Sequence, residues 1–293
     1  MFEEPKIDVV SSLKQYSIVL NYRLKKSAPY LILFAISILV LAPIIWTIST
    51  SLRLGSESFT VPPKWIPTDF RIKNYQDVFS RVPFATLILN SAIFTTSIVL
   101  GQLFTASLAG YAFARLKFPG GKVLFWLILA TMMIPIQATI IPQFILISKF
   151  SLTNTLWALI LPALPTAFGT FLLRQYFLTV PIEMDHSAVI DGANQWQIFF
   201  YVYLPLVKPG LAVLAVLSFN FHWNEFFRPL IFLNTVDKFP ITLGIFELQG
   251  YFMTGSISVV LAGVVLSLIP VIIIYLLGQR YFIEGIMSGA LKG

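Results

Sequence analysis

Six long apolar runs dominate the sequence and restrict what it can fold into. They cover about residues 30–52, 84–113, 123–147, 156–178, 210–233 and 257–282. A helix needs roughly 20 mostly apolar residues to cross the hydrocarbon core of a bilayer. Only 11% of the 293 residues are charged, whereas soluble domains carry about 25%. The runs therefore predict an all-α membrane protein with six transmembrane helices between residues 30 and 282.

Prolines interrupt several of these runs. In a helix bundle, neighbouring helices and waters can satisfy the carbonyl groups that a proline leaves free, so we expect kinked spans rather than loops. Ordinary packing kinks are the simpler interpretation, and a gating hinge is the alternative. The prolines concerned are Pro43, Pro135, Pro142, Pro162, Pro165 and Pro270.

The distribution of basic residues predicts the orientation. The first run is ambiguous, because basic residues lie on both sides of it. The turn between the second and third runs is short and contains Arg115, Lys117 and Lys122 but no acidic residue. Since basic loops stay in the cytoplasm, this turn should be cytoplasmic. The same side would then hold the tails 1–29 and 283–293 and the loop 179–209, with segments 53–83 and 234–256 outside.

Composition also excludes several classes of function. The chain has no cysteine, and its two histidines lie far apart, so no disulfide, thiolate metal site or resident cofactor is expected. The net charge of +7 agrees with basic cytoplasmic loops and does not require nucleic acid as a partner.

The sequence offers no nucleotide-binding loop of its own. A P-loop needs a glycine, four residues, then Gly-Lys and a hydroxyl residue. Gly121-Lys122 has Leu116 at the first position and Val123 at the last. No nucleophile–base arrangement stands out either, so we expect a protein that is not an enzyme.

The loop 179–209 is the most polar interruption in the second half of the chain. Pro181 suits the first turn of a helix, where Glu183 and Asp185 would face the positive end of the helix dipole. Asp191-Gly192 predicts a sharp helix stop, because glycine adopts left-handed backbone angles freely. A second helical segment should follow from about residue 194 and end at Pro205 and Pro209. The face of the first helix would hold Ile182, His186, Val189 and Ile190.

This loop resembles the cytoplasmic "EAA" loop of permease subunits from bacterial ATP-binding-cassette importers. The matching residues are Pro181, Glu183, Ala188, Asp191-Gly192-Ala193, Phe199, Leu204-Pro205-Leu206 and Pro209. Three further stretches resemble the smaller, maltose-type carbohydrate permeases. They are residues 63–67 with Asn74-Tyr75, Trp223-Asn224-Glu225-Phe226 with Pro229-Leu230, and the tail 279–293.

The resemblance implies a type I importer in the bacterial cytoplasmic membrane. A second permease would complete the pathway, two ATPases would hold ATP and magnesium, and an outer binding protein would deliver an oligosaccharide. The first helix of the loop would couple ATPase movement to the spans. The coupling residues would then be Glu183, Asp185, His186, Ser187, Ala188, Asp191, Gly192 and Ala193.

One position departs from the family pattern. His186-Ser187 replaces the usual glutamate and alanine. A carboxylate contact with the ATPase therefore cannot be assumed there, and the neighbouring Asp185 points to a different helix face.

A polar cluster in the fifth run is the candidate for the translocation pathway. It contains Asn220, Trp223, Asn224, Glu225 and Arg228, with His222 nearby. Glu225 and Arg228 are three residues apart and can pair. Ionisable groups within a span usually face a bundle interior or an aqueous cavity. A structural ion pair near the outer interface is the alternative.

Two other classes of function compete with the importer. A secondary transporter or channel would leave the loop 179–209 without a role, and no inverted repeat relates the two halves. A membrane scaffold would leave the polar cluster unexplained. The substrate is expected to be an oligosaccharide, and whole-chain likeness points to an acidic, alginate-like one.

Overall fold

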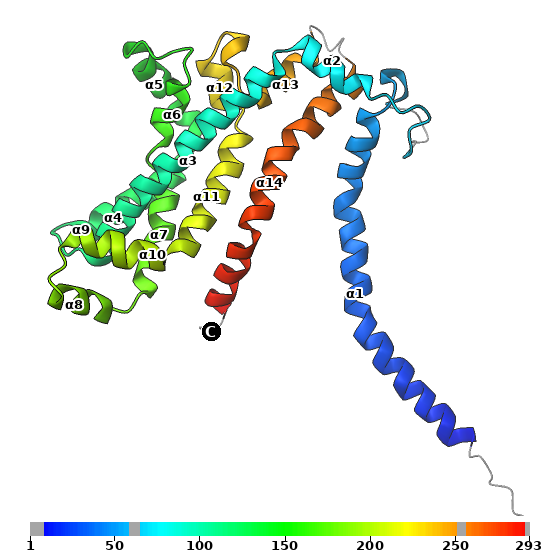
Figure 1. Cartoon of the computed structure of the whole chain (residues 1–293), viewed down its shortest axis with the longest axis horizontal. Coiled ribbons are helices and arrows are strands. Elements are labelled where there is room, and N and C mark those ends of the chain that lie inside the picture. Colours follow the sequence, from blue (N-terminus) through cyan, green and yellow to red (C-terminus); the bar gives the residue numbers. More distant parts are fainter. Residues whose placement is uncertain (1–8, 59–64, 251–255, 291–293) are drawn as a thin grey trace, which may run out of the picture.

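The computed structural model describes residues 9–58, 65–250 and 256–290 (Figure 1). Side chains are described within these ranges except for residues 9–28 and 280–290. All regular secondary structure in these ranges is helical, as predicted. Parts of two motifs noted above lie outside the described residues, namely Pro63-Lys64 and Leu291-Lys292-Gly293.

Three helices are each long and apolar enough to cross a membrane alone. They are α1 (Val9–Ser51), α3 (Phe84–Arg115) and α14 (Ile257–Ala290), with apolar stretches at 29–51, 84–115 and 257–279. These helices confirm the first, second and sixth apolar runs as helical. Pro43 and Pro270 lie inside α1 and α14, so these two prolines leave the helix continuous.

The third and fourth runs, expected to be kinked spans, are each divided into separate helices that form a bent pair. The third contains α4 (Gly121–Ala130), the short η2 (Thr131–Met133) and α5 (Ile136–Lys149), and the chain bends by 102° between its halves. Pro135 lies at the break and Ile134 before it is extended, because a proline disfavours helical geometry in the preceding residue. The fourth run contains α6 (Trp157–Ile160), η3 (Leu161–Ala163) and α7 (Ala167–Thr179), bent by 43°.

The fifth run is also broken. Helix α11 (Lys208–Trp223) ends before Asn224, and the shorter α12 (Phe227–Phe232) follows. A bend of 74° separates α11 from the preceding segment 195–206. The described residues thus hold three unbroken spanning helices, or up to six spans if each bent pair counts as one.

The remaining elements collect at the two ends of the bundle (Figure 1). One end carries α8 (Glu183–Ile190), α9 (Gln195–Gln197), the π-helix η4 (Ile198–Tyr203) and α10 (Leu204–Leu206). The other carries η1 (Gly55–Glu57), α2 (Lys73–Arg81), α12, η5 (Val236–Lys238) and α13 (Ile241–Glu247). The start of α1 and the described end of α14 point toward the α8 end. This arrangement agrees with the predicted grouping of the loops.

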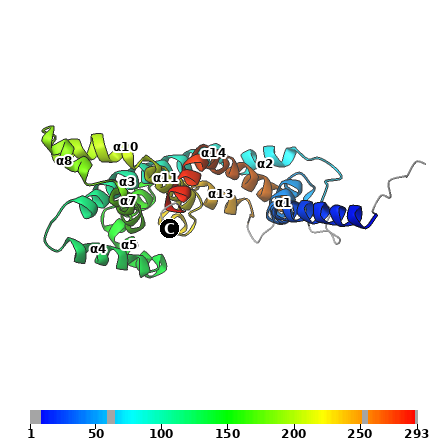
Figure 2. The same ribbon diagram turned by 90° about the horizontal axis from the view of Figure 1, so that it is seen from below.

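Helix α3 is the centre of the packing. Gly110 lets it lie close to α7, because a Cβ there would lie 2.9 Å from the backbone nitrogen of Arg174. The buried apolar side chains form two clusters, one around Phe94 and Trp223 and one around Phe177 and Tyr203. Helix α1 stands at one end of the elongated molecule (Figure 2), and most of its apolar side chains are exposed.

Candidate functional site

Helix α8 ends as its sequence predicts. Gly192 has a φ of 81°, which is the left-handed region that glycine enters freely. The Ala193 N–H donates to the Ala188 carbonyl at 2.9 Å, and the Gly192 N–H donates to the Val189 carbonyl at 3.0 Å. These two bonds form a Schellman motif, so the sharp turn after α8 is confirmed.

The inner side of α8 is anchored by small residues. Ala188 is buried in the cluster that also contains Phe199 and Tyr203, and Ala193 packs against the same cluster. Asp185 is half-buried. The small side chains of Ala188 and Ala193 let α8 lie close to the aromatic segment that follows it, and this packing fixes the helix to the bundle.

The outer side of α8 is exposed and partly apolar. Its exposed apolar side chains are Met184, Val189 and Ile190, with Ile182 just before the helix, and the Ile190 side chain is 85% exposed. The predicted coupling residues Glu183, His186, Ser187, Asp191 and Gly192 are also exposed. The Ser187 hydroxyl donates to the Glu183 carbonyl at 3.0 Å, so it is occupied within the helix.

The segment after α8 connects it to the spans. Asn194 and Gln197 form a capping box that starts the second helical segment near the predicted residue. Arg115, at the end of α3, donates to the Phe177 carbonyl at 2.6 Å and also to the Val180 carbonyl. Its guanidinium lies 4.7 Å from the centre of the Tyr203 ring. The ends of α3 and α7 are therefore tied to the segment that holds α8.

A buried polar network lies at the end of α11. The predicted pairing of Glu225 and Arg228 is confirmed, and both side chains are less than 10% exposed. His222 Nδ1 lies 3.0 Å from the same carboxylate. Arg228 also donates to the Leu159 carbonyl at 3.1 Å. The pair lies across the break between α11 and α12. Because Arg228 also contacts the Leu159 carbonyl, it connects this break to α6.

Gln102 extends this network into α3. Its Nε2 lies 2.7 Å from the Ala163 carbonyl and 3.2 Å from His222 Nε2, and its Oε1 accepts from Ser218 at 2.7 Å. A His222 ring that carries its proton on Nδ1 satisfies both neighbours, because it donates to Glu225 and accepts from Gln102. The hydrogen bonds thus run continuously from Ser218 to the Leu159 carbonyl.

The network borders a cavity of about 670 Å³ between α3, α5, α7 and α11. Its polar lining is mostly uncharged, which suits a ligand rich in hydroxyl groups. Of the residues predicted to line the pathway, Asn220 and Arg228 line this cavity. The other polar lining residues are Gln102, Thr131, Gln143, Thr166, Ser218 and His222.

The remaining predicted pathway residues point elsewhere. Trp223 is buried against α14, where its indole donates to the Ser267 carbonyl at 3.1 Å. Asn224 donates to the Asn220 carbonyl at 2.8 Å, and neither Asn224 nor Glu225 lines the cavity. The sequence analysis did not identify Gln102 and Ser218 as lining the cavity. The one sequence feature that could have pointed to them is that each is a polar residue inside an apolar run.

The described residues contain no cluster of three or more His, Asp or Glu side chains that could hold a metal ion.

Comparison with known sequences identifies relatives along most of the chain. Residues 102–286 match the family described as "Binding-protein-dependent transport system inner membrane component". The arabinooligosaccharides transport system permease protein AraQ of Halalkalibacterium halodurans is 36% identical over 228 residues, which cover 78% of this chain and 81% of the relative. The sn-glycerol-3-phosphate transport system permease protein UgpE of Escherichia coli is 30% identical, over 90% of this chain and 98% of the relative.

A solved structure shares the fold. A chain in the crystal structure of a bacterial ABC transporter involved in the import of the acidic polysaccharide alginate superposes with a TM-score of 0.75 at 29% identity. The match covers 89% of this chain and 97% of that chain.

Proposed function

The chain belongs to the family of binding-protein-dependent transport system inner membrane components, and we propose that it is the smaller, maltose-type permease of an ATP-driven oligosaccharide importer. Its relatives are named as permease proteins, which confirms that the chain is a transport component rather than an enzyme. A secondary transporter or channel would not explain a helix such as α8.

The proposed topology has six spans in residues 30–282, with the tails 1–29 and 283–293 and the loop 179–209 in the cytoplasm. Two of these spans are bent helix pairs, within residues 121–149 and 157–179, and the third bent pair joins the loop segment 195–206 to α11. The basic turn at 115–122 supports this orientation. The location of α8 at the same end as the start of α1 and the described end of α14 is consistent with it (Figure 1).

The exposed apolar face of α8 is the observation that carries the coupling role. A short helix outside the bilayer that leaves isoleucine and valine uncovered needs a partner to bury them. A cleft on an ATPase would serve as that partner. Because Ala188 and Ala193 fix the helix to the aromatic cluster, movement of α8 would pass to α3 and α7 through Arg115 and Tyr203.

The remaining partners follow from this role. A second permease would complete the pathway, two ATPases would bind ATP and magnesium, and an outer binding protein would deliver the substrate. Closure of the ATPase dimer would carry α8 with it and open the pathway outward.

The proposed substrate is an oligosaccharide. The relative AraQ is named for arabinooligosaccharides, and the amide and hydroxyl groups of the cavity suit sugar hydroxyls. An acidic, alginate-like oligosaccharide is the specific candidate, supported by the alginate importer chain of 29% identity. Since Glu225 neutralises Arg228, recognition of a carboxylate would rest on the binding protein or the second permease.

Replacing one exposed isoleucine tests the coupling role. Ile190→Ser should reduce both the ATPase that co-purifies with the chain and substrate-stimulated ATP hydrolysis. Burial of an isoleucine side chain contributes about 1.5–3 kcal/mol, so docking should weaken roughly tenfold or more. Ile66→Ser is the matched control, because Ile66 is 75% exposed at the other end of the bundle. Equal ATPase recovery with both variants would contradict the role of α8.

A further inference from the structure

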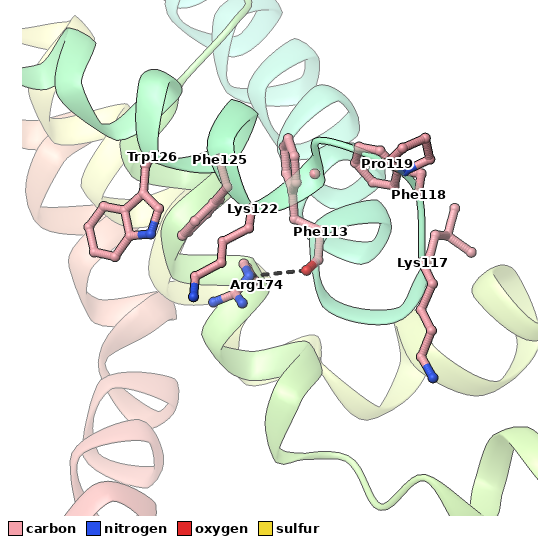
Figure 3. Close-up of a pocket in the computed structure, with 10 residues that line it drawn as sticks. Phe113, Lys117, Phe118, Pro119, Lys122, Phe125, Trp126 and Arg174 are labelled. Carbon is pink, nitrogen blue, oxygen red and sulfur yellow. Dashed lines mark hydrogen bonds between the residues drawn. The ribbon is translucent and has the colours of Figure 1, made fainter.

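A second large pocket lies at the α8 end of the bundle, apart from the coupling helix and the central cavity. It has a volume of about 660 Å³ and lies between the end of α3, the turn 116–120, the start of α4 and α7 (Figure 3). Its walls are aromatic and its charged residues are all basic, namely Lys117, Lys122 and Arg174. Neither the coupling role nor the translocation pathway uses it.

The cations of this pocket have no acidic partner. None of them forms an ion pair within the described part of the chain, and no acidic residue lines the pocket. Figure 3 shows Lys122 and Arg174 extending toward the same side of the pocket. Like charges in one pocket repel each other, so an anion bound there would stabilise the arrangement.

Arg174 is held in place for such a contact. Its Nε donates to the Phe113 carbonyl at 3.1 Å, and its guanidinium lies 4.4 Å from the centre of the Phe125 ring. These contacts leave its two terminal nitrogen atoms without a hydrogen-bond partner among the described residues. A guanidinium fixed in this way can bind a phosphate with two parallel hydrogen bonds.

An apolar face continues from the pocket along α4. The exposed side chains on this helix are Val123, Leu124, Trp126 and Leu127, and the Trp126 side chain is 62% exposed. The pocket itself lies where one apolar run ends and the next begins, which is the level of lipid headgroups. A ligand with a phosphate and an alkyl chain would contact both the cations and this face.

We propose that the pocket binds the headgroup of an anionic phospholipid, with its phosphate between Lys122 and Arg174 and an acyl chain along α4. Basic pockets between spans on the cytoplasmic side are suited to such lipids. The apolar face distinguishes a phospholipid from free phosphate, which would gain nothing from it. The lipid would hold the α3–α4 turn at a fixed depth in the membrane.

Lipid titration of the complete importer tests this proposal. The purified complex would be titrated with dioleoyl phosphatidylglycerol, dioleoyl phosphatidylcholine or inorganic phosphate, and bound molecules counted by native mass spectrometry. Wild type should bind the phosphatidylglycerol preferentially. The double variant Lys122→Gln/Arg174→Gln should bind it roughly 25-fold less tightly, since each basic residue near an anionic surface contributes about fivefold.

The matched control removes the same charge elsewhere. Lys149→Gln/Lys238→Gln should bind phosphatidylglycerol as wild type does, because neither lysine lines the pocket. Equal affinity in both double variants would overturn the site. Inorganic phosphate that displaces phosphatidylglycerol at equal concentration, or phosphatidylcholine that binds equally well, would overturn the choice of an anionic phospholipid.

Discussion

Gln102 on α3 and His222 on α11 meet through their Nε2 atoms, 3.2 Å apart, although 120 residues separate them in the sequence. The contact joins the most central helix to the break at which α11 ends. Because the same amide side chain also contacts Ser218 and the Ala163 carbonyl, Gln102 links three segments of the bundle. The network therefore depends on one neutral side chain as much as on its ion pair.

Removing the amide of Gln102 should destabilise the importer more than removing one of its partners. Gln102→Leu keeps a similar volume but leaves three buried polar groups without this partner, at about 1–3 kcal/mol for each unsatisfied group. Ser218→Ala leaves one buried group, the Gln102 Oε1, without this partner, for about 1–3 kcal/mol in total. Thermal unfolding of the purified complex would compare the two variants. A loss for Gln102→Leu no larger than that for Ser218→Ala would contradict the linking role.

Neutralising either member of the Glu225–Arg228 pair should lower the amount of assembled complex. Removing one partner of a buried pair costs about 3–5 kcal/mol. The charge-swapped variant Glu225→Arg/Arg228→Glu should not restore assembly, because His222 and the Leu159 carbonyl need the present order of acceptor and donor. Co-purification of the partner subunits measures this. Normal assembly with impaired transport would instead assign the pair to the pathway.

The sequence predicted the unbroken helices better than the bent ones. Run 84–113 contains no proline and forms one helix, and run 257–282 is also continuous although Pro270 lies inside it. Run 123–147 breaks by 102° at Pro135. Hydropathy measures how apolar a run is, but whether a proline kinks or breaks it depends on neighbouring helices that supply or withhold hydrogen bonds.

The turn after α8 could be predicted from the sequence, whereas the cavity beside α11 could not. The turn at Gly192 follows from local backbone chemistry, so the sequence alone predicted it. The cavity depends on which polar residues of distant runs face each other. The residues next to Gln102 in the sequence do not indicate that its side chain lines a cavity. Trp223 was assigned to the pathway because of its neighbours in the sequence, yet its indole faces Ser267 on α14.

Cysteine labelling should establish the sidedness of the bundle. The chain has no cysteine, so each introduced thiol reports one position. Asp69→Cys, in the proposed outer segment, should react with a membrane-impermeant maleimide in spheroplasts. Pro119→Cys, in the basic turn, should react only after permeabilisation. The reverse labelling would overturn the orientation, and with it the cytoplasmic location of α8.

Replacing His186 should affect coupling but not stability. The side chain is exposed and forms no hydrogen bond or ion pair with the residues that the structure describes. His186→Ala should therefore leave thermal unfolding of the chain unchanged. If the imidazole contacts the ATPase, a lost hydrogen bond of about 0.5–1.5 kcal/mol should weaken docking roughly two- to tenfold. Titration of the ATPase onto reconstituted permeases would measure this, and unchanged affinity would exclude His186 from the interface.

Gly192 offers the sharpest test of the coupling segment. An added Cβ would meet no other atom within 4 Å, so any effect of a substitution comes from its φ of 81°. Gly192→Val should strain the turn by roughly 1–2 kcal/mol or more, loosen the end of α8 and weaken ATPase docking. Gly192→Asn is the matched control, because asparagine enters the left-handed region readily. Both variants should insert normally, since the turn lies outside the spans. Co-purification of the ATPase and substrate-stimulated hydrolysis would compare them. Full activity of Gly192→Val would show that the geometry of this turn is not needed for coupling.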